Sequence, residues 1–381
     1  MRNHKSKSTQ VSASDYITYG IYRVSEAILR LLPMEIVCIV GSCMGQGAYF
    51  LMHRRRSIVM RNLRIAYGEN LNMPEIRALT RKTFRHSGLN LMASMPASVI
   101  DNDELKDRVE VEGLENLHHA LRQNKGCILL LAHMGNWEIL TQLKVLAPEI
   151  QSLASLYRPL NNPLLDRLIK RRRQRKGAIL FSKYDSFTKP ITHIKQGGTL
   201  GCIADQNAGS HGTALPLFGK TTSMTSLPAL LHRKTKAPIL PISMITVGLG
   251  QWKVIFHPSI TVSEAEKKNT YLLTALCAKA YERIMSESPT DVLWMHGYWK
   301  VGRKRPLKID GTQQKIPQTD SDIRAESKDL KPFRILVYLG NTPATNPHIS
   351  SQLGALVNSG LNAQLTLVGL APEHPFADHV I

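Results

Sequence analysis

The chain has 381 residues, enough to bury a full core, with room for one large domain and an accessory piece. Lysine and arginine outnumber aspartate and glutamate by 49 to 29, and a formal net charge of +20 indicates an anionic partner: nucleic acid, an anionic membrane surface or an acidic protein. The five cysteines form no CxxC or other metal-ligand spacing, which argues against a cysteine-based metal site and a disulfide framework and predicts reduced thiols in a cytoplasmic compartment.

Residues 1–52 form a basic N-terminus followed by two apolar segments, with no pattern of a cleavable secretory signal. The second segment, 34–52, is mostly apolar, but Glu35, Gln46 and three glycines make it marginal for a spanning helix, which needs about 20 apolar residues. We interpret the region as a monotopic or single-pass membrane anchor; two core helices of a soluble domain are the alternative. The first segment repeats apolar residues every three or four positions and predicts a helix with one apolar face, which ends at Pro33: Ile17, Ile21, Val24, Ile28 and Leu31.

From 109 to 300 the pattern alternates between apolar runs and amphipathic stretches. Asn162 is suited to cap a helix with Pro163 at its first position, and Gly177 closes that helix. The pattern predicts an α/β fold, an open mixed sheet with flanking helices, whose ligands bind at the carboxyl ends of the strands. The expected strands are 126–132, 150–159, 177–182, 199–205, 237–245 and 252–258, and the other expected helices are 187–196, 226–236 and 265–286.

A titratable pair follows the first of these strands. His133 stands at its carboxyl end, and Asn136 is a candidate N-cap that places Glu138 in the first turn of the next helix. Glu138 can then fold back beside the imidazole, where a carboxylate fixes the tautomer of a general base. The alternative is a structural histidine near a helix start, with Glu138 favouring the positive end of the helix dipole.

Several blocks in order make the sequence resemble the bacterial lipid A biosynthesis acyltransferases, the lauroyl/myristoyl transferase family. AHMGNWE at 132–138 resembles the catalytic motif of that family, and VLWMHGYWK at 292–300 resembles its terminal Trp-rich motif. SLYRPL at 155–160, ADQNAG at 204–209 and RRRSIVMRNLRIAYGE at 54–69 are similar to its Tyr-Arg-Pro, Asp-Gln and Arg-Asn-Leu blocks. The chain departs from the family at Leu217-Phe218-Gly219, where Phe-Phe-Gly is frequent, and at His211.

The resemblance implies a glycerolipid-acyltransferase-like fold and assigns roles to individual residues. His133 is implied as the catalytic base and Glu138 as the acid that orients it, while Arg158, Asp205 and Gln206 are implied in substrate binding. In this mechanism the base deprotonates a hydroxyl of a lipid acceptor, which attacks an acyl thioester.

The oxyanion formed in that attack needs hydrogen-bond donors. The main-chain N–H groups of Gly135 and Asn136, or Arg158, are expected to stabilise it. Arg158 has two other interpretations, a phosphate contact and a surface ion pair.

Arg171, Arg172 and Arg173 belong to a basic run at 171–176 that follows the predicted Asn162 cap. We expect these arginines to contact the acidic helix of acyl carrier protein or anionic headgroups, although such a run is commonly a solvated helix face. The expected donor is an acyl carrier protein thioester, and no metal or other cofactor is expected. The expected location is the cytoplasmic face of the inner membrane.

The expected organisation is a membrane-associated segment at 1–52, an acyltransferase domain at 53–303, a polar linker at 304–331 and a partial Rossmann-like βαβ unit at 332–381. The last unit weakly resembles the start of a heptosyltransferase-type glycosyltransferase, which suggests a truncated second domain or a unit that packs on the first.

Three rival functions remain open at this stage. A nucleic-acid-binding protein would explain the charge, but aromatic residues are 6% of the chain and no recognised nucleic-acid motif is present. A hydrolase would use His133 and Glu138 to activate water, but the chain has no GxSxG motif. An acyltransferase acting on another glycolipid or phospholipid is the nearest alternative.

Overall fold

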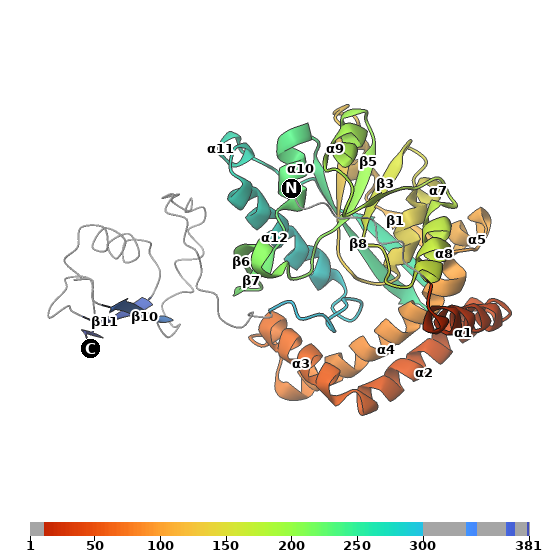
Figure 1. The fold of residues 1–381 in the computed structure, drawn as a ribbon, viewed down its shortest axis with the longest axis horizontal. Coiled ribbons are helices and arrows are strands. Elements are labelled where there is room, and N and C mark those ends of the chain that lie inside the picture. Colours follow the sequence, from red (N-terminus) through yellow and green to blue (C-terminus); the bar gives the residue numbers. More distant parts are fainter. Residues whose placement is uncertain (1–10, 300–332, 341–362, 370–378, 381) are drawn as a thin grey trace. The chain divides into compact units, whose positions relative to one another are not determined.

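The computed structural model describes residues 11–299, 333–340, 363–369 and 379–380. The chain divides into two compact units, Met1–Lys304 and Arg305–Ile381, which we describe separately. The first unit holds a central sheet with helices around it and contains every candidate site residue named above (Figure 1).

A seven-stranded sheet forms the centre of the first unit, in the order β1-β9-β8-β2-β5-β3-β4. All neighbouring strands are parallel except β8 and β9, which form an antiparallel pair. This arrangement confirms the predicted open mixed sheet. The strands are β1 (Val109–Glu112), β2 (Cys127–Leu131), β3 (Leu153–Tyr157), β4 (Ile179–Ser182), β5 (Thr199–Ile203), β8 (Ile239–Gly248) and β9 (Gln251–Phe256).

Helices lie on both faces of this sheet (Figure 1). Helix α8 begins as predicted, because the Asn162 side chain accepts hydrogen bonds from the main-chain N–H groups of Leu164 and Leu165. The helix expected over 265–286 is divided into α11 and α12. The helices around the sheet are α5 (Asn102–Arg108), α6 (Leu114–Leu121), α7 (Leu143–Leu146), α8 (Pro163–Gln174), α9 (Thr188–Lys195), α10 (Leu227–Thr235), α11 (Glu264–Lys267) and α12 (Thr270–Glu287).

A two-stranded hairpin that the sequence analysis did not predict stands outside the main sheet. Its strands are β6 (Thr213–Leu217) and β7 (Lys220–Met224). The connecting residues Phe218 and Gly219 both have positive φ, +47° and +69°, as the two-residue turns that suit the twist of a hairpin require. The segment that departs from Phe-Phe-Gly is therefore this turn.

The N-terminal part consists of α1 (Ala13–Arg30), α2 (Met34–Leu51), α3 (His53–Tyr67) and α4 (Met73–Ala97). Helix α2 packs closely on α4 through glycines: an added Cβ on Gly41 would lie 2.6 Å from the carbonyl oxygen of Gly88, and one on Gly45 would lie 2.2 Å from that of Phe84. Helix α2 is also long and apolar enough to cross a membrane by length and composition alone.

Helix α1 presents its apolar residues to the outside rather than to the core. Its buried side chains are Glu26 and Leu29. The predicted apolar face is instead more than half exposed at each position: Ile17, Ile21, Val24, Ile28 and Leu31.

The second unit contains three parallel strands in the order β10-β11-β12: β10 (Phe333–Gly340), β11 (Ala363–Gly369) and β12 (His379–Val380). The first two strands were predicted from the sequence. The predicted linker at 304–331 and the predicted helix between β10 and β11 lie outside the described residues.

Candidate functional site

The carboxyl ends of β2 and β5 bring two distant polar residues together. The strands are parallel neighbours, with Leu131 opposite Ile203. His133 and Asp205 each follow by two residues, so they leave the sheet side by side, and His133 Nδ1 lies 2.7 Å from Asp205 Oδ1. The site thus forms at the edge of the sheet where ligands of α/β proteins bind.

Asp205 is buried, and its carboxylate is held by strong donors. Besides the imidazole contact, Asp205 Oδ2 accepts hydrogen bonds from the His133 main-chain N–H at 3.2 Å and from the Tyr298 hydroxyl at 2.9 Å. Burial alone would raise the pKa of this carboxyl, but the charge of His133 and these hydrogen bonds outweigh it and lower the pKa. The carboxylate therefore stays ionised beside the imidazole.

His133 is held in position but remains accessible. Its main-chain carbonyl accepts a hydrogen bond from the Leu293 N–H at 2.9 Å, and its side chain is 22% exposed. Burial lowers the pKa of the imidazole, but the Asp205 charge and hydrogen bond more than offset this, so the pKa is raised overall. With Nδ1 bonded to Asp205, the ring presents Nε2 as the atom that accepts a proton.

Glu138 does not orient the imidazole, which corrects the prediction from the sequence. Its two carboxylate oxygens accept hydrogen bonds from Arg173, at 2.9 Å from Nε and 2.6 Å from Nη2. It lies in a 3-10 helix, Trp137–Gln142, and contributes to the raised pKa of His133 only through its charge. The carboxylate that fixes the tautomer is Asp205, which had been assigned to substrate binding.

The turn after His133 depends on a glycine. Gly135 has φ +54°, and an added Cβ would lie 2.2 Å from the carbonyl oxygen of Met244 in β8. Its N–H donates to the Asp291 carbonyl at 3.0 Å and so is not available to an oxyanion, contrary to the prediction. The Asn136 N–H donates to no other described residue.

Asn136 precedes the 3-10 helix as expected, but its side chain makes no capping hydrogen bond. Among the described residues, its buried Oδ1 and Nδ2 atoms also lack a partner. Its predicted place at the helix start is therefore confirmed, without the predicted capping contact.

A second histidine, which the sequence analysis quoted only within a motif, stands against the first. The rings of His133 and His296 are 5.4 Å apart between centroids. Gln206 Nε2 lies 2.7 Å from His296 Nε2 and 3.4 Å from His133 Nε2. Burial and the charge of His133 lower the pKa of His296. The site therefore pairs an imidazole of raised pKa with one of lowered pKa. Among the described residues, no group of three His, Cys, Asp or Glu side chains is suited to hold a metal.

The sequence matches the model of the bacterial lipid A biosynthesis acyltransferase family over residues 4–301. The chain belongs to this family. It is therefore an acyltransferase, and the resemblance noted from its motifs is confirmed.

Curated relatives of this acyltransferase differ in the acyl group that their names give. The lipid A biosynthesis palmitoleoyltransferase of Escherichia coli strain K12 is 24% identical over 273 residues, 71% of this chain and 87% of the relative. The lauroyltransferase of the same organism is 26% identical over 276 residues, with the same shares covered. The myristoyltransferase is 24% identical over 198 residues, 51% of this chain and 59% of the relative.

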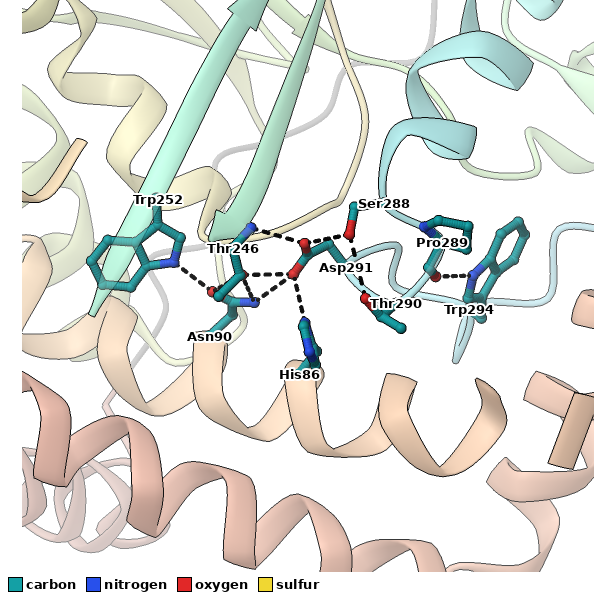
Figure 2. Close-up of polar contacts among 9 residues, drawn as sticks. All are labelled: His86, Asn90, Thr246, Trp252, Ser288, Pro289, Thr290, Asp291 and Trp294. Atoms are coloured by element: carbon teal, nitrogen blue, oxygen red, sulfur yellow. Dashed lines mark hydrogen bonds and ion pairs between the residues drawn. The ribbon is translucent and has the colours of Figure 1, made fainter. Parts of the chain in front are cut away.

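A buried polar network holds the segment of the acyltransferase that follows α12, residues 288–294 (Figure 2). Asp291 is its centre and accepts hydrogen bonds from His86 and Asn90 of α4, from Thr246 of β8 and from Ser288, at 2.7–3.2 Å. In the main chain of this segment, the Asp291 carbonyl accepts a hydrogen bond from the Gly135 N–H, and the Leu293 N–H donates to the His133 carbonyl. Helix α4 thus helps to set the shape of the turn after His133.

Asn62 of α3 holds the next part of that segment. It is buried, and its Nδ2 donates to the carbonyl oxygens of Trp294 at 2.8 Å and His296 at 2.7 Å. The Arg-Asn-Leu block recognised in the sequence therefore serves to position the Trp-rich motif. Spacing within either block alone would not reveal this contact, because the two partners are more than 230 residues apart.

The predicted cationic residues differ in exposure and pairing: some are exposed without a partner among the described residues, and others form ion pairs. Arg158 follows β3 at the same edge of the sheet; its side chain is exposed and has no partner among the described residues. Arg172 is buried, where it pairs with Glu26 and donates to the Tyr22 hydroxyl of α1, while Arg173 pairs with Glu138. The predicted contact of all three arginines with a carrier or headgroups is therefore corrected for Arg172, which is buried; of the three, Arg171 alone is exposed and unpaired among the described residues.

Proposed function

We propose that this acyltransferase moves a fatty acyl chain from an acyl carrier protein thioester to a hydroxyl of a lipid A precursor. The observation that carries the proposal is the accessible His133 imidazole, whose Nδ1 is bonded to the buried Asp205 carboxylate at the carboxyl edge of the sheet. The names of the relatives, which specify lipid A biosynthesis and different acyl groups, support the same reaction class.

The reaction begins with proton transfer to His133. Nε2 takes the proton of the acceptor hydroxyl as its oxygen attacks the thioester carbonyl carbon, and Asp205 stabilises the imidazolium that forms. The tetrahedral intermediate then collapses, the carbon–sulfur bond breaks, and the imidazolium returns its proton to the departing thiolate. The products are an ester and the free thiol of the carrier.

Asn136 and Arg158 are the candidates to stabilise the oxyanion. The Gly135 N–H is already bonded to Asp291, whereas the Asn136 N–H has no partner among the described residues. Arg158 stands free at the end of β3, one strand beyond β5. Donors of this kind act on charge that develops in the transition state and therefore raise the rate.

The carrier protein and the membrane account for the basic charge of the chain. Arg171 is placed on α8, whose neighbour Arg173 contacts Glu138 beside the site. The outward apolar face of α1 suits a helix that lies in a lipid interface. We place the enzyme on the cytoplasmic face of the inner membrane, with α1 as an interfacial anchor and α2 supported by α4.

Incubation of the full chain with a radiolabelled acyl carrier protein thioester and a panel of acceptor lipids tests the proposal. We expect label to move to a lipid A precursor, with no loss of rate in EDTA. Transfer to another glycolipid or to phospholipids in preference would assign a different acceptor. Release of free fatty acid without transfer would identify a thioester hydrolase instead.

A further inference from the structure

A cationic pocket lies between α3 and the hairpin, and none of the residues described at the acyl-transfer site lines it. It has a volume of about 440 Å³. Aromatic contacts join the end of α3 to the hairpin turn, because Phe218 packs edge-on against Tyr67 and Trp294. The pocket is lined by Ser57, Met60, Arg61, Arg64, Ile65 and Lys220.

Among the described residues the pocket cations have no partner, unlike two other cations of α3; Arg54 is also exposed and without a partner there, but it does not line the pocket. Arg55 donates to the Met295 carbonyl, and Arg56 donates to the Tyr49 carbonyl and stacks on that ring. Arg61, Arg64 and Lys220 are exposed and make no ion pair or side-chain hydrogen bond with any described residue. No acidic residue occurs in α3, so the three positive charges converge without internal compensation.

We propose that this pocket binds a phosphomonoester group carried by the lipid acceptor. Two guanidinium groups three residues apart on one helix face match the oxygens of a phosphate. Lys220 adds a third positive charge, which favours a phosphomonoester with its two negative charges over a phosphodiester with one. Met60 and Ile65 supply an apolar wall for the part of the lipid next to the phosphate. This inference rests on the function proposed above, because it identifies what the acceptor carries.

The pocket is joined to the acyl-transfer site by one helix. Asn62, the neighbour of Arg61, bonds to the carbonyl oxygens of Trp294 and His296, and the His296 ring stands against His133. Helix α3 also follows the exposed end of α2, where Phe50 and Leu51 are 54% and 80% exposed. The helix that carries the pocket cations therefore also contacts the segment that holds His296 against His133.

A charge-matched pair of variants tests the binding. The pocket variant is Arg61→Gln/Arg64→Gln/Lys220→Gln; the control is Lys106→Gln/Lys195→Gln/Lys234→Gln, which removes the same charge from exposed positions without a partner among the described residues. Flotation of the full chain is measured with phosphatidylcholine vesicles that contain phosphatidic acid, or phosphatidylglycerol at equal surface charge. The wild type and the control should favour the phosphomonoester about tenfold, and the pocket variant should bind both vesicles alike.

Retention of that preference by the pocket variant, or its equal loss in the control, would overturn the assignment. Displacement of the wild type from phosphatidic acid vesicles by low-millimolar inorganic phosphate would assign the pocket to free phosphate instead.

The KM for acyl transfer gives a second test, with two acceptors that differ only in phosphate. The KM of the wild type is measured for an acceptor glycolipid and for the same lipid after phosphatase treatment. The pocket variant should raise the KM for the phosphorylated acceptor about tenfold and leave that for the treated acceptor unchanged. Transfer without any difference between the two acceptors would refute the pocket while leaving the proposed function intact. Absence of transfer with every acceptor would refute the proposed function, and the vesicle comparison would still decide the pocket.

Discussion

Two carboxylates lie close to the His133 imidazole, and they have different surroundings. Asp205 is fully buried and accepts hydrogen bonds from His133 and Tyr298. Glu138 is 24% exposed and accepts hydrogen bonds from Nε and Nη2 of Arg173. Glu138 is five residues from His133, and Asp205 is 72 residues away. Adjacency of parallel strands, rather than nearness along the chain, therefore selects the residue that orients the base.

Removal of the His133 imidazole should have the largest effect on the rate of transfer. In His133→Ala, transfer should fall at least ~10²-fold, because no group then takes the hydroxyl proton. Initial rates with the carrier thioester measure the loss, and circular dichroism confirms that the fold is kept. A folded variant with full activity would remove His133 from the mechanism.

Asp205→Asn should have the next largest effect, about 10²-fold on kcat/KM. The neutral base is the active form, so activity rises with pH through the His133 pKa, which Asp205 raises. Removal of that charge lowers the pKa and moves the acid limb of the kcat/KM profile to lower pH, while the plateau falls because the imidazolium is no longer stabilised. An unchanged limb would show that Asp205 does not act on the base.

Glu138→Gln should mainly affect stability. We expect the rate to fall less than tenfold and the free energy of unfolding to fall by about 1–2 kcal/mol, because Arg173 loses a charged hydrogen-bond partner. Urea unfolding of Glu138→Gln, Arg173→Met and the double variant measures the coupling of the pair. A rate loss as large as that of Asp205→Asn would instead support the original assignment of Glu138 as the acid that orients His133.

Arg171→Glu should have the smallest effect and should change only the encounter with the donor. We expect the KM for the carrier thioester to rise a few-fold at low salt and the difference to shrink at 1 M salt, where the Debye length is about 3 Å. Lys195→Glu on α9 is the matched control for charge, and kcat should stay the same in both. Equal KM values in the two variants would exclude a specific contact at Arg171.

Six of the seven strands of the sheet and the helices α8 to α12 could be predicted because their signals are local, whereas β1, α5 and α6 were missed. The buried run of β2 and the Asn162-Pro163 start of α8 are read within a few residues. The β6–β7 hairpin was missed because its turn uses Phe218 with positive φ, where asparagine or glycine is the usual signal.

Only the part of the site that has a local signal in the sequence could be predicted. The position of His133 at the end of a strand follows from its local sequence, but its pairing with Asp205 requires the neighbour of β2 to be known. Tyr298 and His296 reach the site from a segment that Asn62 and Asp291 fix through contacts of long sequence separation. Such contacts leave no periodic signal in the chain.

The attachment of α1 to α8 has a consequence for how the enzyme meets its acceptor. Arg172 pairs with Glu26, and Asn162 Nδ2 donates to the Asp15 carbonyl at 3.0 Å, so the loop after Arg158 is fastened to the helix that we place in the lipid interface. An enzyme fixed to the surface in this way collects its lipid by diffusion in two dimensions. Its rate is then governed by the mole fraction of acceptor in the membrane, and dilution with inert lipid slows it even when the total amount of acceptor is constant.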